Sequence, residues 1–277
     1  MTNKLILFSS LFCVLLSCNQ LGDDSYLFEN TGKINEIILV MEDDLWTGSK
    51  GDILRKIFEK DIQGLPQSEQ FFNLIQINQS QFNRIFHSHR NIMFVSEDVR
   101  NSYSKNKWAK SQIVIYLNSD TDDKDFRENS IKSFNYLDRK EMETLKYTYQ
   151  KGHNKDARFY ISENFGFDLY LPTEYTVSLK SEEIFISDFH SFSENQDLLK
   201  YIIVYEFTPS DYDIQNEIIK ETDLILQKYI LGIEKGTYVQ IDRRIPLTNK
   251  DGIYRGIWRL ENGFMGGPFV LKTRYIK

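Results

Sequence analysis

Two short segments carry side chains that could bind a metal ion. The first is the acidic run Glu42, Asp43 and Asp44, which follows the apolar stretch Ile37–Met41. Carboxylate oxygens are the ligands that Mg²⁺ and Ca²⁺ prefer, and ligands of α/β folds gather at the carboxyl ends of strands. Trp46 comes next, so Asp43, Asp44 and Trp46 form a candidate ligand-binding site. The alternative is a solvated loop that leads into a helix.

The second segment contains His87, His89 and Arg90. Alternate histidines on an extended segment point to one side and could ligate zinc, with a carboxylate as third ligand. The alternative is a polar helix end, where the imidazoles and Arg90 meet backbone carbonyls. Together the two segments allow one enzymatic hypothesis, a periplasmic metal-dependent hydrolase.

A third candidate lies near the end of the chain, where Trp258 precedes the segment Phe264–Phe269. Two glycines before Pro268 allow a tight turn between strands, and the aromatic residues suit either a binding cleft or a closed core. Neither a phosphate-binding loop nor a GxSxG motif occurs in the chain. We therefore predict no catalytic residue and no cofactor, and the sequence favours a binding site over an enzyme.

Cys18 has the clearest chemical role. Lys4 and the apolar stretch Leu5–Leu16 have the form of a signal peptide. The apolar stretch is too short to span a bilayer permanently. The ending Leu15–Cys18 resembles the lipobox of bacterial lipoprotein precursors, in which the cysteine is acylated before residues 1–17 are removed. An ordinary secretory signal or an uncleaved short anchor is the alternative.

Acyl chains on Cys18 would hold the mature protein on a membrane. Asn19 differs from the aspartate that retains lipoproteins at the inner membrane, so we expect the outer membrane. Asp23 and Asp24 resemble a surface-display signal or belong to a solvated tether. The expected location is therefore the periplasmic face or the cell surface.

Composition excludes several functions. The chain has 34 basic and 40 acidic residues, for a net charge of −6, and nucleic-acid binding needs concentrated positive charge. Cys13 would leave with the leader and Cys18 would be acylated, so the folded part has no free thiol. This excludes a cysteine nucleophile, a cysteine-ligated metal and an internal disulfide. Aromatic side chains can supply the core instead.

Hydrophobic patterns predict a mixed α/β and α+β fold. After a flexible tether (18–33), four apolar runs and a helical segment alternate, which is typical of a layered α/β lobe over 34–150. A long helix over 122–149 ends that lobe, and the period breaks at 151–156. The four predicted strands are Ile37–Met41, Phe71–Ile77, Asn91–Ser96 and Gln112–Leu117, with a helix over 51–60.

The segment 156–277 predicts an antiparallel α+β lobe, in which short strands are joined by turns and a helix packs on the sheet. The predicted strands are 165–172, 175–179, 184–187, 201–207, 238–241, 253–260 and 268–275, with the helix over 212–231.

Four blocks together resemble an uncharacterised family of lipoproteins in bacteria with two membranes. They are Asp43–Gly48, Gly64–Gln67, His89–Ile92, and Trp258 with Phe264–Phe269. The resemblance covers nearly all of the mature chain and implies a domain of unknown function, with no catalytic residues. We predict a lipid-anchored, non-catalytic binding or assembly module. Its expected partners are the membrane, through the acyl chains, and an envelope protein or a small-molecule ligand.

Overall fold

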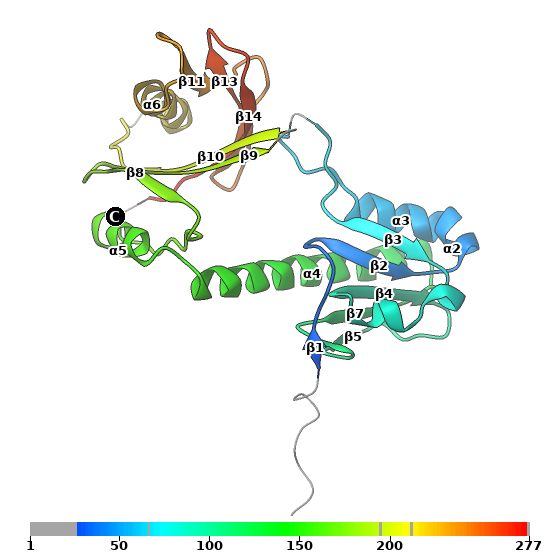
Figure 1. Ribbon diagram of the computed structural model, residues 1–277. Coiled ribbons are helices and arrows are strands. Elements are labelled where there is room, and N and C mark those ends of the chain that lie inside the picture. Colours follow the sequence, from blue (N-terminus) through cyan, green and yellow to red (C-terminus); the bar gives the residue numbers. More distant parts are fainter. Residues whose placement is uncertain (1–26, 66, 194–195, 211–212, 276–277) are drawn as a thin grey trace, which may run out of the picture. The chain divides into compact units, whose positions relative to one another are not determined.

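The computed structural model describes residues 27–65, 67–193, 196–210 and 213–275 (Figure 1). Within these residues the chain forms two compact units. The N-terminal unit contains residues 27–59 and 72–137, and the C-terminal unit contains 60–71 and the residues from 138 onward. Each unit has its own sheets and core, and the boundary between them falls within the long helix α4 (Asp123–Lys151).

The N-terminal unit is built on a five-stranded sheet in the order β3-β2-β4-β7-β5, of which only β5 is antiparallel. Its three central strands, β2, β4 and β7, are almost continuously buried, as expected for a parallel sheet covered on both faces. Four of the strands confirm the predicted ones, whereas β5 was not predicted. The strands are β2 (Glu36–Val40), β3 (Asn73–Ile77), β4 (Asn91–Ser96), β5 (Ser102–Lys105) and β7 (Ile113–Asn118).

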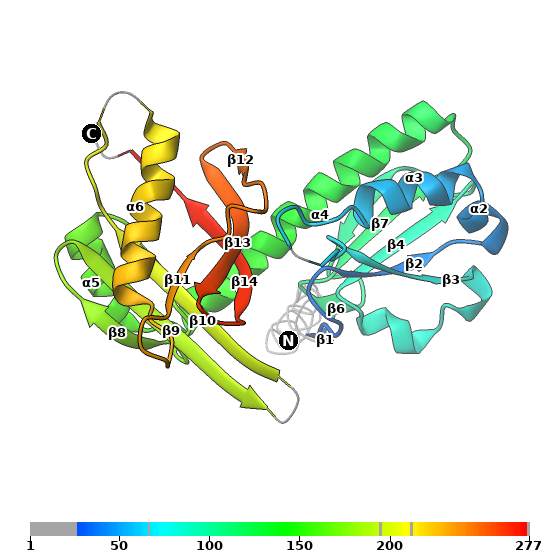
Figure 2. The same cartoon turned by 90° about the horizontal axis from the view of Figure 1, so that it is seen from above.

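Helices cover one face of this sheet. Helix α3 (Ser49–Phe58) and the first half of α4 lie on the same side (Figure 2). Their rings meet there, because Phe58 and Phe134 both contact Phe72, with ring centroids 5.9 and 5.4 Å from it. This cluster of three buried phenylalanines fixes the two helices on the sheet.

Loops cover the opposite face. Phe82, Phe86 and Trp108 pack on the strand residues Ile38 and Val114, with the rest of one apolar cluster. The chain there forms only short 3-10 helices, η3 (Gln79–Gln81) and η4 (Arg84–Ser88). The short strands β1 (Phe28–Glu29) and β6 (Ala109–Lys110) pair with each other and complete the unit. Aromatic side chains thus take the place of crossover helices on this face.

The C-terminal unit has two antiparallel sheets and two helices. One sheet has the order β10-β9-β8, and in the other β13 pairs with β11, β12 and β14. The bounds are α5 (Lys155–Phe165), β8 (Thr176–Lys180), β9 (Ile184–Ser193), β10 (Gln196–Tyr205), α6 (Ile214–Tyr229), β11 (Tyr238–Ile241), β12 (Thr248–Lys250), β13 (Ile253–Glu261) and β14 (Gly266–Lys272).

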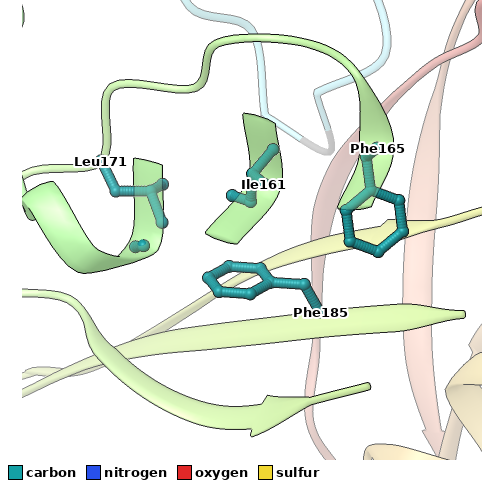
Figure 3. Packing of buried hydrophobic residues seen from close by; sticks show 5 residues of the cluster. Ile161, Phe165, Leu171 and Phe185 are labelled. Carbon is teal, nitrogen blue, oxygen red and sulfur yellow. The ribbon is translucent and has the colours of Figure 1, made fainter. Parts of the chain in front are cut away.

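The two faces of the β8–β10 sheet carry different cores. On one face α5 packs its buried Ile161 and Phe165 against Leu171 and Phe185 (Figure 3). On the other, Ile184 and its neighbours form a cluster with residues of α6, β11 and β13. This arrangement confirms the predicted C-terminal antiparallel sheet packed by a helix.

The predicted strand over 165–172 is wrong: residues 166–171 form no strand, and the unpredicted helix α5 ends just before them. Asn154 caps the helix by accepting a hydrogen bond from the Ala157 amide (3.0 Å), and Gly166 ends it in a left-handed conformation, with φ of 67°. The apolar residues of this helix do not form one stripe, because Phe159 is exposed whereas Ile161 and Phe165 are buried. No helix in the described part of the chain is long and apolar enough to cross a membrane.

Candidate functional site

The acidic residues after β2 tie two strand ends together. Asp43 accepts hydrogen bonds through its two carboxylate oxygens from the side-chain amides of Gln76 (3.1 Å) and Asn78 (3.2 Å). Glu42 accepts one from the backbone N–H of Gln79 (3.2 Å). These bonds join the start of α2 (Asp43–Thr47) to the end of β3. Both acids therefore have a structural role at the carboxyl edge of the sheet.

The position of this edge still suits a ligand. The connection after β2 leads to β3 on one side, whereas the connection after β4 leads to β5 and β7 on the other, and α/β folds bind ligands at such a switch point. Asp43 and Asp44 lie there, as the sequence predicts for a site at a strand end, and Asp44 is exposed. No group of three histidines, cysteines or acids among the described residues could hold a metal ion.

Trp46 packs inside the junction between α2 and α3. The guanidinium of Arg55 lies 4.2 Å from the centre of the indole ring, and Arg55 donates a hydrogen bond to the Trp46 carbonyl (3.0 Å). Asp52 holds the same guanidinium at 2.6 Å. Gly51 is required here, because a Cβ at that position would lie 1.8 Å from the Trp46 carbonyl oxygen. Trp46 therefore stabilises the α2–α3 corner.

The zinc hypothesis requires His87 and His89 to lie on an extended segment. The structure does not place them on one. His87 belongs to η4 and His89 follows its end, and the 3-10 turn directs side chains two positions apart to different sides. His87 stacks on Trp108, with ring centres 4.5 Å apart. His89 is buried and lies 3.0 Å from the Glu36 carboxylate and 3.0 Å from the Asn91 carbonyl oxygen. The two imidazoles thus have separate partners.

The hydrogen bond from His89 is the main reason that the pKa of Glu36 lies below its usual value. Arg90 joins the same region through its backbone, since its N–H donates to the Thr31 carbonyl (2.8 Å) and its carbonyl accepts from Ile113 (2.8 Å). Of the two imidazoles, His89 meets a backbone carbonyl whereas His87 stacks on a ring. The two bonds of Arg90 to Thr31 and Ile113 are made by its backbone.

Gln112 organises this region, although no sequence pattern pointed to it. Its side chain is fully buried and donates hydrogen bonds to the carbonyls of His87 (2.6 Å) and His89 (2.7 Å). Its carbonyl oxygen accepts from the Trp108 backbone N–H (2.9 Å). A single amide therefore holds the η4 loop beside the Trp108 loop, which keeps His87 stacked on the indole.

Trp258 lies over a glycine of the neighbouring strand. It pairs with Gly267 across β13 and β14, and a Cβ on Gly267 would lie 3.0 Å from the indole nitrogen. The prediction of a turn at the two glycines before Pro268 is wrong. Both glycines belong to β14, and the chain turns earlier, at 262–265. Glycine is used there to make room for the ring. Pro268 is compatible with its place in β14, where it lies in a strand with a single partner.

A groove of about 270 Å³ follows one side of α5. Lys155, Arg158, Phe159 and Ser162 line it at helical spacing, together with His153 and Asp168. Arg158 donates a hydrogen bond to Asp168 (2.7 Å), and this bond raises the pKa of the guanidinium. The groove combines basic groups and a hydroxyl with the exposed phenyl ring of Phe159. Sequence patterns missed it because they missed the helix.

Two protein families match the chain, and the boundary between the two matches lies close to 151–156, where the helical period of the sequence breaks. A domain of unknown function (DUF8532) matches residues 30–150, and a second one (DUF4837) matches residues 153–277. Neither a curated protein nor a solved structure matches the chain. The expectation that the chain carries a domain of unknown function is confirmed.

Proposed function

We propose that this chain, with its DUF8532 and DUF4837 domains, is a lipid-anchored cell-envelope protein that acts as a non-catalytic binding or assembly module. The lipid anchor is proposed from the sequence: a short apolar leader ends at Leu15–Cys18, in the pattern of a lipobox. Cys18 lies outside the described residues. Asn19, the residue after Cys18, favours attachment to the outer membrane, on the periplasmic face or the cell surface.

The groove along α5 carries the proposal of a binding function. Binding sites combine apolar walls with a few polar groups that orient the ligand, and here Phe159 stands beside Lys155 and Ser162. About 270 Å³ is enough for a small ligand or for one or two side chains of a partner protein. Asp168 fixes the Arg158 side chain in the groove wall, so part of the site is preorganised.

The side chains first considered for metal chemistry support the same proposal. Asp43, Trp46 and His89 are engaged with neighbouring groups of the N-terminal unit. A hydrolase would need His87 and His89 to share an ion with a carboxylate. Elemental analysis of the native protein tests this alternative, because stoichiometric zinc that is lost in His89→Ala would replace our proposal with the enzymatic one.

Fractionation of cells tests the lipid anchor. The wild type should be in the membrane fraction and should incorporate labelled fatty acid, whereas Cys18→Ala should lose the label and remain as precursor or soluble protein. Substitution of Ser17 by a bulky residue such as Trp should also block processing, because the residue before the cysteine is small in lipoboxes. Soluble, unlabelled wild-type protein would contradict the anchor.

Site-specific photocrosslinking in intact cells tests the groove. A photoreactive residue in place of Phe159 should give a discrete adduct, and Lys155→Ala should weaken it. Ile85 is a matched control, because it is an exposed apolar residue of the other unit. The same adducts from both positions, or none from Phe159 with protein or small molecule, would contradict binding at the groove.

A further inference from the structure

Four large apolar side chains are exposed in two loops of the C-terminal unit. Leu231 and Ile233 belong to the α6–β11 connection, and Phe264 and Met265 belong to the β13–β14 turn. The relative exposure of Ile233 is 105% and that of Phe264 is 109%. Values this high mean that both side chains project beyond their neighbours. We refer to these four residues as the apolar tips.

The two loops are neighbours at one end of the sheet. Leu260 of β13 lies between them, because a Cβ on Gly232 would be 3.1 Å from one of its methyl groups and a Cβ on Gly263 would be 2.5 Å from the other. Asn262 also donates a hydrogen bond from its side chain to the Gly236 carbonyl (3.4 Å). The apolar tips therefore lie at the same end of the sheet.

Backbone hydrogen bonds hold both loops in shape. Gly232 donates to Thr237 (3.1 Å), Thr237 donates to Glu234 (3.1 Å), and Leu260 donates to Met265 (2.8 Å). The loops are thus defined turns, and their geometry directs the large side chains outward. An apolar side chain that is held in water by an ordered turn is typical of a surface that meets an apolar phase.

We infer that the apolar tips insert into the interface of a lipid bilayer. The tips are convex and comprise four side chains, whereas a stable protein interface needs about 800 Å² of complementary surface on each partner. Glu234 and Lys235 beside Ile233 balance in charge. Apolar burial therefore drives the contact, and it should change little with salt.

This inference rests on the lipid anchor of the proposed function for its choice of occupant. The segment from Cys18 to Leu27, where the described chain begins, can span at most about 30 Å. An acyl chain at Cys18 thus keeps the folded protein at high local concentration near the bilayer. The apolar tips supply a second contact that does not depend on the acyl chain.

Fluorescence quenching tests the insertion directly. Phe264→Trp is placed in the mature chain, residues 18–277, which also carries Cys18→Ala so that no acyl chain contributes. Vesicles of phosphatidylethanolamine and phosphatidylglycerol with brominated acyl chains should quench the new tryptophan and shift its emission to the blue. Ile85→Trp is the control and should show neither effect. The protein without either new tryptophan gives the background signal of the native tryptophans.

Cosedimentation with the same vesicles measures the contribution of the tips. Ile233→Ser with Phe264→Ser should lower the vesicle partition coefficient at least tenfold, because each side chain loses its transfer from water. Ile85→Ser should leave the coefficient unchanged. Both substituted positions are fully exposed, so thermal unfolding should not change and a folding defect would be detected separately.

Three results would overturn the inference. The first is an absence of quenching at position 264, and the second is an equal loss of partition in the Ile85→Ser control. The third is a dimer in sedimentation velocity that dissociates on Ile233→Ser, which would make a second copy of the chain the occupant. Failure of acyl labelling at Cys18 would remove the anchor alone, since quenching is measured without it.

Discussion

The two units bury their strands in different patterns. In the N-terminal unit, β2 and β4 are buried at almost every position, whereas in the C-terminal unit β8 and β14 alternate between partly buried and exposed. A parallel sheet is covered on both faces, and an antiparallel sheet can leave one face to solvent. The C-terminal unit thus has more freedom to present side chains outward.

The two units also differ in how they use polar and apolar side chains. The N-terminal unit joins its loops with buried polar groups such as Gln112 and His89, which are satisfied by defined partners. The C-terminal unit contains the groove along α5 and the fully exposed Ile233 and Phe264. Both surfaces that we propose for binding, the groove and the apolar tips, thus belong to the C-terminal unit.

The largest expected effect tests how tightly the N-terminal unit is packed. Gly51→Ala should cost more than about 3 kcal/mol of unfolding free energy, because the new methyl group would overlap the Trp46 carbonyl and the corner must move. Urea unfolding measures this. Gly152→Ala is the control, since nothing lies within 4 Å of its Cβ position; equal effects in the two variants would break the comparison.

A smaller loss is expected when a buried polar link is removed. Gln112→Ala leaves two carbonyls and one N–H without their partner, so unfolding free energy should fall by about 2–3 kcal/mol. Gln240→Ala, in the C-terminal unit, is the matched control because its amide binds Glu261 at a partly exposed site, and we expect a loss below about 1 kcal/mol. Hydrogen exchange should show that Gln112→Ala opens the η4 and Trp108 loops first.

Acid should weaken the two units over different pH ranges. Glu36 has a lowered pKa, so its contribution is present above the ordinary value of 4.5 and is lost as pH falls through the folded-state pKa. A hydrogen bond to a charged group such as the Glu36 carboxylate contributes about 1.5–3 kcal/mol. Glu36→Gln should remove that part of the pH dependence, as measured by urea unfolding above and below pH 4.5.

Asp242 gives the corresponding test in the C-terminal unit. The Arg244 guanidinium lowers the pKa of its carboxyl from 3.8 to about 2, so its contribution is complete above 3.8 and disappears as pH falls towards 2. Asp242→Asn should therefore change acid unfolding only below about pH 3.8. An NMR titration in which the Asp242 carboxyl keeps its ordinary pKa of 3.8 would contradict this assignment.

The smallest expected effect concerns the groove. Asn154→Ala removes the cap of α5 and should cost about 1 kcal/mol, with faster amide exchange in the first turn of the helix. Asn164→Ala is the control, because its side chain bonds only within the helix, to the Tyr160 carbonyl. If capping positions the groove, photocrosslinking from position 159 should weaken in Asn154→Ala and persist in the control.

Sequence patterns predicted most of the elements but few of their contacts. The four parallel strands were predicted because burial on both faces requires consecutive apolar residues. Helix α5 was missed because its buried residues Ala157, Ile161 and Phe165 are mixed with the exposed Phe159, so its apolar residues show no clear helical stripe. His87 and His89 looked like a pair because spacing along the chain cannot show the 3-10 turn that separates them.

The sequence by itself determined the class of fold, the four parallel strands and the long helix α4, because each of these depends on neighbouring residues. Only the tertiary structure decided that Gln112 joins His87 to Trp108, that Gly267 lies under Trp258, and that Ile233 and Phe264 share one end of a sheet. Such contacts join residues that are distant in the chain. Packing of the whole unit selects them, so no local pattern can predict them.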